Sequence, residues 1–195
     1  IDATGMKRIE RLIADLKASR YQPKPVRRVY IPKASGKQRP LGIPTFEDKL
    51  LQTVLKLILE AIYEPTFSPA SHGFRADHSC HTALEQVKAM RGTRWWIEGD
   101  IRDFFSSMDH EVLLTILRRR ITDQRFLHLI RQFLKAGYLE NWQTYPTYSG
   151  IPQGGNLSPL LSNLYLNELD QFMVCYMTQF NRGKVRRQTK AYRSL

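Results

Sequence analysis

The apolar residues in the first half of the chain recur with the period of an α-helix in three stretches. Their spacing predicts helices over residues 5–20, in the segment after Thr45, and over residues 80–90. Between the first two helices, the runs 26–32 and 37–43 are rich in β-branched residues and are joined by a basic turn that contains glycine. This arrangement predicts one β-hairpin placed among helices.

The second half of the chain mixes short strands and helices in the same irregular way. Residues 94–101 favour a β-strand that delivers Asp100 at its carboxyl end, and a short strand is predicted near residues 144–148. Helix starts are expected at Asp109, at Thr122 or Asp123, and at Ser158–Pro159. The mixture indicates the α+β class, with an antiparallel sheet packed with helices, and argues against a doubly wound parallel fold.

The composition is that of a folded protein, because 42% of the 195 residues are hydrophobic and 25% are charged. No apolar run is long enough for a transmembrane helix. Cys80 and Cys175 show no metal-binding spacing and favour a reducing compartment, so we expect a cytoplasmic (bacterial) or organellar protein that is not secreted. The chain begins without Met and without an apolar signal core, which indicates an internal piece of a longer protein.

The net charge of +12 is concentrated in two segments. Between Asp15 and Glu47 there are eight Lys or Arg residues and no acid, and the tail from Asn181 to Leu195 carries six more. A segmental excess of positive charge is typical of proteins that bind a polyanion, because phosphate contacts release counterions. A solvated, solubilising surface is the alternative, and for the tail both interpretations stand. In the first segment, the candidate RNA-binding residues are Lys24, Arg27 and Arg28.

Two segments carry side chains suited to nucleotide chemistry. In the first, Ile97–Phe105, Asp100 is followed by a turn with two aromatic residues. A carboxylate there suits a hard divalent cation, which phosphoryl transfer uses to neutralise the attacking and leaving oxygens. In the second, Gly150–Pro159, glycines permit close backbone approach and Gln153 offers both a donor and an acceptor. Each segment alone also fits an ordinary turn or helix-entry loop.

Four blocks, read in order, resemble group II intron-encoded reverse transcriptases, also called intron maturases. They are VRRVYIPKASGKQRPLGIPTFEDKLLQ, EPTFSPASHGFRADHSCHTAL, EGDIRDFFSSMDHEVLLTIL and SGIPQGGNLSPLLSNLYLNELD. The resemblance extends from about Met6 to Leu195 and implies the fingers and part of the palm of a right-hand polymerase. It also implies RNA-directed DNA synthesis with Mg²⁺, an RNA template, a DNA primer and dNTP, and binding of the intron RNA to assist splicing and mobility.

Carried over residue by residue, the resemblance makes Asp100 the catalytic metal ligand, with the carbonyl of Ile101 as a second ligand. Phe105 corresponds to the aromatic residue that lies under the nucleotide sugar and excludes a ribose 2′-hydroxyl. The SHGFR block implies a template path, with Arg75 as the phosphate contact. The remaining nucleotide-binding positions are Lys33, Arg39, Arg102, Asp103, Phe104 and Gln153.

The sequence departs from the family pattern in three ways. Asp103 stands where the family often has Gly, and Ser106 where it often has Asp. The Tyr-Ala-Asp-Asp-like hairpin block, which supplies the remaining carboxylates, does not occur in this sequence. Because two-metal catalysis needs several ligands around both ions, we expect the 195-residue chain to bind RNA without polymerising on its own.

We therefore expect a fingers region over residues 1–92, with the N-terminal helix and the basic hairpin, and a palm region over residues 93–195. Two alternatives stay open: a non-catalytic RNA-binding maturase, and a reverse transcriptase of the retron or diversity-generating type. The blocks that begin at Val26 and Ser149 favour the intron family over the second alternative. No membrane partner is expected, and the oligomeric state, a homodimer included, stays open.

Overall fold

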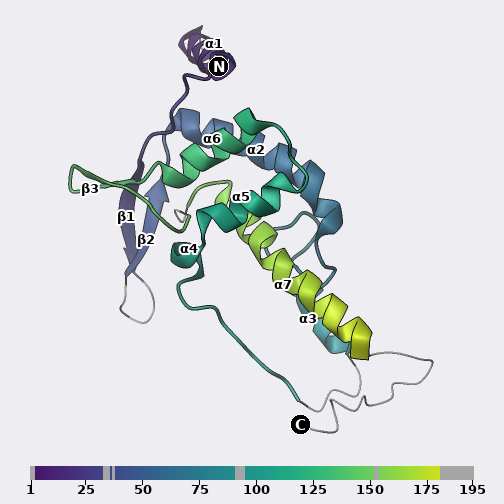
Figure 1. The fold of residues 1–195 in the computed structure, drawn as a ribbon. Helices are drawn as coiled ribbons and strands as arrows, with labels where there is room; N and C mark the ends of the chain where they lie inside the picture. The colour runs from purple at the N-terminus through teal and green to yellow at the C-terminus, as the bar shows by residue number, and fades with distance from the viewer. Residues whose placement is uncertain (1–2, 33–35, 37, 91–94, 152–153, 181–195) are drawn as a thin grey trace.

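The computed structural model describes residues 3–32, 36, 38–90, 95–151 and 154–180, which form helices around one side of a small sheet (Figure 1). In chain order the elements are α1 (Ala3–Lys17), β1 (Val26–Pro32), β2 (Gln38–Ile43), α2 (Phe46–Tyr63), the 3₁₀ turn η1 (Glu64–Thr66), α3 (Cys80–Ala89), α4 (Phe104–Ser107), α5 (His110–Arg118), α6 (Gln124–Lys135), β3 (Tyr138–Glu140), β4 (Gln143–Tyr145) and α7 (Ser158–Phe180). None of the described helices is long and apolar enough to cross a membrane.

The sheet has the strand order β2-β1-β3-β4. Strands β1 and β2 form the predicted antiparallel hairpin, with Arg27 opposite Ile43 and Pro32 opposite Gln38. Strand β3 was not predicted; it pairs parallel to β1 through Val26 and Tyr138, so the sheet is mixed and not wholly antiparallel. The parallel pair follows from the chain path, because the long crossover through the helices returns β3 to the free edge of β1.

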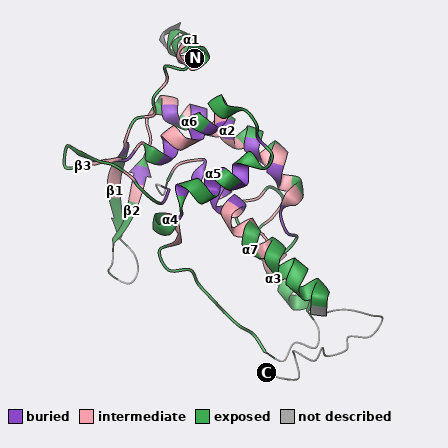
Figure 2. Ribbon diagram, in the orientation of Figure 1, coloured by how far each residue is buried: buried purple, intermediate pink, exposed green. Residues whose placement is uncertain are grey.

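The hydrophobic core lies between α2, α5, α6 and the first half of α7 (Figure 2). Leu59 of α2, Leu113 and Leu117 of α5, and Ile130 of α6 are fully buried. Burying one such side chain contributes about 1.5–3 kcal/mol to the free energy of unfolding. The core therefore joins residues from both sides of position 92, where the sequence suggested a boundary between two regions.

Short polar side chains set the starts of three helices, as the sequence predicted for each. Thr45 accepts a hydrogen bond from the backbone N–H of Asp48 at the start of α2. Asp109 and Asp123 accept two backbone N–H groups each at the starts of α5 and α6. These bonds stabilise the ionised carboxylate and hold the pKa of Asp109 below its usual range.

The chain between α1 and β1 is fixed on α2 by the buried carboxylate of Asp48. The Tyr21 hydroxyl donates to Asp48 Oδ1 at 2.5 Å, and the backbone N–H of Lys24 donates to Oδ2 at 3.3 Å. Burial first, and then the neighbouring carboxylate, raise the pKa of Tyr21, so the phenol stays a donor. The contact fixes Lys24 two residues before β1 begins at Val26.

The predicted strand over residues 94–101 is wrong for the part that the structure describes. Residues 95–101 form no strand, and Trp95 and Ile97 are 88% and 99% exposed. Figure 1 shows this segment running away from the sheet. A strand needs a neighbour for its backbone N–H and C=O groups, and no described strand lies beside these residues, so their β propensity finds no ladder.

Candidate nucleotide-binding site

A cleft between β2 and the turn at α4 collects most of the residues expected to bind a nucleotide. Its volume is about 1080 Å³, and it is lined by residues 38–40 of β2, residues 99–106 and Leu166 of α7. The cleft brings together Arg39, Asp100, Ile101, Arg102, Asp103, Phe104 and Phe105. Lys33 and Gln153 lie outside the described residues. Residues that are distant in sequence, on the hairpin and on the α4 turn, thus face one space.

The two adjacent phenylalanines of α4 pack differently. Phe104 lies edge-on against Tyr165 of α7, with ring centroids 6.2 Å apart, and packs against the hydrophobic core. Phe105 meets Phe104 edge-on at 5.6 Å and lines the cleft. Helix α7 therefore anchors the first ring, and the first ring supports the second at the cleft wall.

Asp103 precedes α4 in the left-handed conformation, with φ 49° and ψ 33°. Glycine adopts this conformation without steric cost, and aspartate is one of the few other residues that tolerate it. The backbone thus gives a physical reason for the glycine that the resembled family often has at this position. The Asp103 carboxylate is 76% exposed and lies 3.6 Å from Nε of Arg102.

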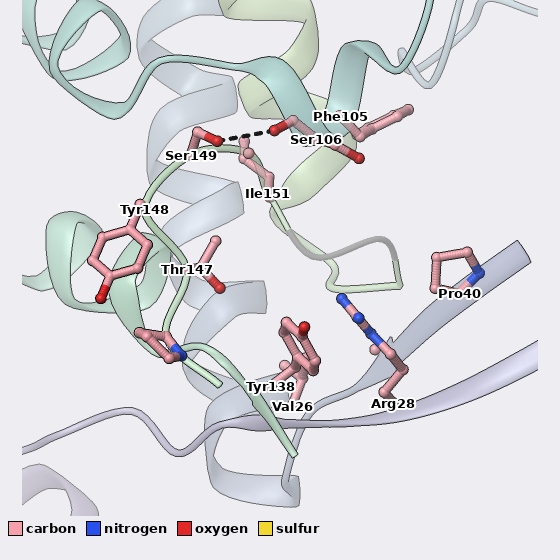
Figure 3. Close-up of a pocket in the computed structure, with 13 residues that line it drawn as sticks. Val26, Arg28, Pro40, Phe105, Ser106, Tyr138, Thr147, Tyr148, Ser149 and Ile151 are labelled. Carbon is pink, nitrogen blue, oxygen red and sulfur yellow. Dashed lines mark hydrogen bonds between the residues drawn. The ribbon is translucent and has the colours of Figure 1, made fainter. Parts of the chain in front are cut away.

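A second, smaller cavity is also lined by Phe105 (Figure 3). Its volume is about 250 Å³, and it shares Pro40, Phe105 and Ser106 with the cleft. Arg28 reaches its edge from β1, and Tyr138 lines it from β3. Phe105 therefore lines both spaces.

The α4 turn is joined to residues 149–151 by a row of hydrogen bonds that we call the turn–loop seam. The backbone N–H of Gly150 donates to the Met108 carbonyl at 2.8 Å, and that of Ile151 donates to the Phe105 carbonyl at 2.7 Å. The Ser149 hydroxyl donates to the Ser106 carbonyl at 3.2 Å, as Figure 3 shows. These bonds fix the residues that directly precede Pro152 and Gln153.

The far side of the same loop is fixed on the hairpin and on α2. Gly154 has φ +110°, and a Cβ atom there would lie 2.5 Å from the Gly42 carbonyl oxygen of β2. Asn156 Nδ2 donates to Thr53 Oγ1 of α2 at 2.8 Å. Residues 149–151 are thus bonded to the α4 turn and residues 154–156 lie against β2 and α2, and Gly150 and Gly154 allow the close approach that the sequence suggested.

Replacing Gly150 by alanine is expected to destabilise the protein by roughly 2–4 kcal/mol, because strain and overlap act together. Gly150 has φ +80°, and its added Cβ would lie 2.6 Å from the Phe105 carbonyl oxygen. Gly36 provides a matched control, since it has φ +77° but nothing within 4 Å of a Cβ. Urea unfolding of both variants measures the difference, and equal losses in Gly150→Ala and Gly36→Ala would show that the overlap is relieved at no cost.

The cleft offers oxygen ligands of the kind that a hard cation prefers. Asp100 has a carboxylate and Ile101 a backbone carbonyl at its edge. Across the described ranges, no three His, Cys, Asp or Glu side chains gather as a metal site. The two groups fit a divalent cation in their chemistry, and they supply only part of its shell.

Among the predicted RNA-binding residues, Lys24 and Arg27 are exposed and Arg28 is half-buried. The Arg28 guanidinium lies over the Tyr138 ring, 3.2 Å from its centroid, and 3.7 Å from the Glu140 carboxylate. Tyr138 in turn stacks on Tyr145 at 5.2 Å. Lys24 and Arg27 are therefore available to a polyanion, whereas Arg28 also has a packing role.

Arg75 has a structural environment in place of the expected open one. Its side chain is 7% exposed, and its guanidinium forms an ion pair with Glu64 at 2.8 Å and donates to the carbonyls of Ser68 and Ser71 at 2.8 and 2.6 Å. Phe67 lies against the same group. Because these acceptors engage most of its donors, Arg75 holds the 64–75 loop together, and its role as a phosphate contact stays a prediction.

Several residues of the two cavities were missed from the sequence. Pro40 and Leu166 line the cleft, and Tyr138 lines the smaller cavity. Leu166 belongs to the apolar pattern of α7, where nothing distinguishes a cleft residue from a core residue. Pro40 could have been found from the sequence, because it directly follows Arg39 in the hairpin block that carried the resemblance.

Comparison with known proteins gives a family match over most of the chain. Residues 31–180 match the model of the family described as "Reverse transcriptase (RNA-dependent DNA polymerase)". The chain belongs to the reverse transcriptase family. Members of this family generally use a divalent metal ion.

Two of the similar proteins have names that place them in introns. The chain is 51% identical over 196 residues to "Group II intron-encoded protein LtrA" of Lactococcus lactis subsp. cremoris, covering 100% of this chain and 33% of LtrA. It is 46% identical over 183 residues to "Uncharacterized 91 kDa protein in cob intron" of Schizosaccharomyces pombe, covering 93% of this chain and 23% of that protein. The chain thus spans a third or less of the length of these two relatives.

Solved structures support the fold. The chain is similar to one in the "Partial Cas6-RT-Cas1--Cas2 complex", with a TM-score of 0.56 and 24% sequence identity. The match covers 90% of this chain and 31% of that one. At this identity the similarity shows the arrangement of helices and sheet, and the reverse transcriptase fold expected from the sequence is confirmed.

Proposed function

We propose that this chain is the fingers and partial palm of a group II intron-encoded reverse transcriptase that synthesises DNA on an RNA template. The observation that carries the proposal is the cleft. It gathers Arg39 from the hairpin and residues 100–105 from the α4 turn around one space. Separate sequence blocks contribute these residues, and a nucleotide site needs them together. The intron-encoded relatives support the same assignment.

The side chains of the cleft divide into groups suited to different parts of a nucleoside triphosphate. Arg39 and Arg102 carry the positive charge that a triphosphate requires. Asp100 and the Ile101 carbonyl would hold Mg²⁺, which neutralises charge on the attacking and leaving oxygens when bound. Phe105, whose ring is supported by Phe104, is the residue that would lie under the sugar. The proposed division assigns residues 1–92 to the fingers and residues 93–195 to the palm.

The test of this function is primer extension by the protein that contains this chain together with its remaining palm carboxylates. With an RNA template, a DNA primer, dNTP and Mg²⁺, we expect DNA synthesis that requires the template. The 195-residue chain alone is expected to bind RNA and not to extend the primer, because Asp100 and one carbonyl leave most of the metal shell to water. RNA binding without synthesis by the longer protein would favour the non-catalytic maturase instead.

A maturase role requires binding to structured RNA, and the exposed basic residues support it. Changing both Lys24 and Arg27 to Ala is expected to weaken RNA binding several-fold at low salt and to reduce the salt dependence, because two phosphate contacts are lost. Filter binding across a range of salt concentrations measures both quantities. Arg118 and Lys135 are exposed on α5 and α6, so changing both to Ala removes the same charge as a control.

Equal loss of RNA affinity in the two double variants would contradict a site at Lys24 and Arg27, because it would show that only total charge matters. Arg28 is left unchanged in this test because loss of its stacking on Tyr138 would add a packing defect.

The two cysteines are free and exposed, which supports the proposed cytoplasmic or organellar location over a secreted one.

A further inference from the structure

His110 is a buried side chain that no part of the expected site uses. It is the first residue of α5 and is 4% exposed. Its Nε2 atom lies 2.7 Å from the carbonyl oxygen of Gly150. This hydrogen bond adds a buried side chain to the turn–loop seam, because His110 follows the α4 turn and Gly150 belongs to the loop.

The partner of Nε2 shows that this nitrogen carries a hydrogen atom. A carbonyl oxygen only accepts, so Nε2 carries the hydrogen and donates it to Gly150. Nδ1 is buried and has no hydrogen-bond partner among the described residues. Leaving one polar ring atom unpaired costs free energy, so packing alone would favour an apolar residue here. The bond to Gly150 is the feature that an apolar residue cannot supply.

Both backbone groups of Gly150 are held from one short segment. Its N–H donates to the Met108 carbonyl at 2.8 Å, and its C=O accepts from His110. The adjacent N–H of Ile151 donates to the Phe105 carbonyl at 2.7 Å. The peptide planes on both sides of Gly150 are thus fixed relative to Phe105.

We propose that His110 is a positioning residue that sets the spacing between Phe105 and residues 149–151, and thereby the fit of the incoming nucleotide. The inference rests on the proposed function, because it takes these two segments to contact the nucleotide. His110 itself lines neither the cleft nor the smaller cavity. Its effect reaches the nucleotide through the Gly150 carbonyl.

Kinetics of the polymerase-active protein test the proposal. His110→Leu removes the donor at similar volume and is expected to raise KM for dNTP about ten-fold, with kcat within about two-fold, and to lower discrimination against ribonucleotides. His110→Gln retains an N–H near the position of Nε2 and is expected to keep KM within about two-fold of wild type. Ser149→Ala removes only the exposed seam bond at 3.2 Å and is expected to change KM less than two-fold.

An unchanged KM in His110→Leu, or equal increases in His110→Leu and His110→Gln, would overturn the proposal. If His110→Leu does not fold, His110→Asn replaces it, since its amide is too short to reach Gly150. The Asn variant is then expected to raise KM and the Gln variant to keep it, and equal values would overturn the proposal.

Hydrogen exchange of the 195-residue chain tests the positioning separately from catalysis. His110→Leu is expected to speed exchange at the N–H groups of Gly150 and Ile151 by about ten-fold, with α6 unchanged, and His110→Gln to restore protection. Unchanged exchange at both N–H groups would overturn the positioning claim. Absence of DNA synthesis by the wild-type protein would instead refute the proposed function, and this measurement would still decide the role of His110.

Discussion

Asp100→Asn is expected to reduce DNA synthesis by the polymerase-active protein at least about a thousand-fold, because it removes the carboxylate proposed to hold the metal ion. Fold and RNA binding are expected to stay intact. Asp100 is exposed and has no hydrogen bond or ion pair with any residue that the structure describes, so the change breaks no internal contact. Primer extension, thermal unfolding and RNA binding measured on one preparation check all three expectations.

Asp103→Asn is the matched control for this experiment. It removes the same charge from the same cleft three residues away, and asparagine tolerates the left-handed conformation that Asp103 adopts. We expect it to retain most of the activity, because Asp103 is expected to meet the triphosphate through its main chain and no metal is assigned to its carboxylate. Similar losses in both variants would mean that the total charge of the cleft matters and not a metal ligand at Asp100. Substantial synthesis by Asp100→Asn, or collapse of its fold, would refute the assignment.

Phe105→Val is expected to relax discrimination against ribonucleotides by about ten- to a hundred-fold in the same protein. The reason is steric, since a flat ring under the sugar leaves no room for a 2′-oxygen and a smaller side chain opens that room. Single-nucleotide incorporation with matched dNTP and ribonucleotides measures the ratio of kcat/KM values. Phe105 also lines the smaller cavity, so a shorter side chain leaves more space beside the sugar. We therefore expect the change in the ratio to come from faster incorporation of ribonucleotides.

Phe104→Val separates this steric effect from a packing defect. Phe104 packs against Tyr165 and the core and supports Phe105 from behind, so its truncation is expected to lower the free energy of unfolding by about 1–3 kcal/mol and to relax discrimination much less than Phe105→Val does. If Phe104→Val relaxes discrimination as much as Phe105→Val, general loosening of the α4 turn is the cause. If Phe105→Val incorporates ribonucleotides no better than wild type, Phe105 is a packing aromatic.

The sequence predicted those elements whose signals are local. Thr45, Asp109 and Asp123 cap their helices through bonds to residues two or three positions away, so the pattern alone locates them. The hairpin was predicted for the same reason, since its two strands are adjacent in the chain. The prediction was wrong for residues 95–101 and missed β3 because a strand depends on a partner that is distant in the sequence. Residues 95–101 have no partner strand among the described residues, whereas β3 pairs with β1.

For the site, the resemblance located residues that composition could not. Seven predicted residues line one cleft, although no local pattern places Arg39 beside Asp100. Arg75 and His110 show the limit of the same reasoning. The acceptors of Arg75 are backbone carbonyls of its own loop, and the partner of His110 is a carbonyl forty residues away. Such acceptors exist at every position of a chain, so the sequence does not single them out.

The exposure of residues 95–101 also gives the protein a spectroscopic handle. All three tryptophans of the chain are exposed to solvent: Trp95, Trp96 and Trp142 are 88%, 62% and 94% exposed. No buried indole therefore contributes a constant blue-shifted emission, and two of the three fluorophores lie within five residues of Asp100. A change in emission wavelength reports directly on whatever covers the polypeptide beside the proposed metal ligand, whether a newly paired strand or a nucleic acid.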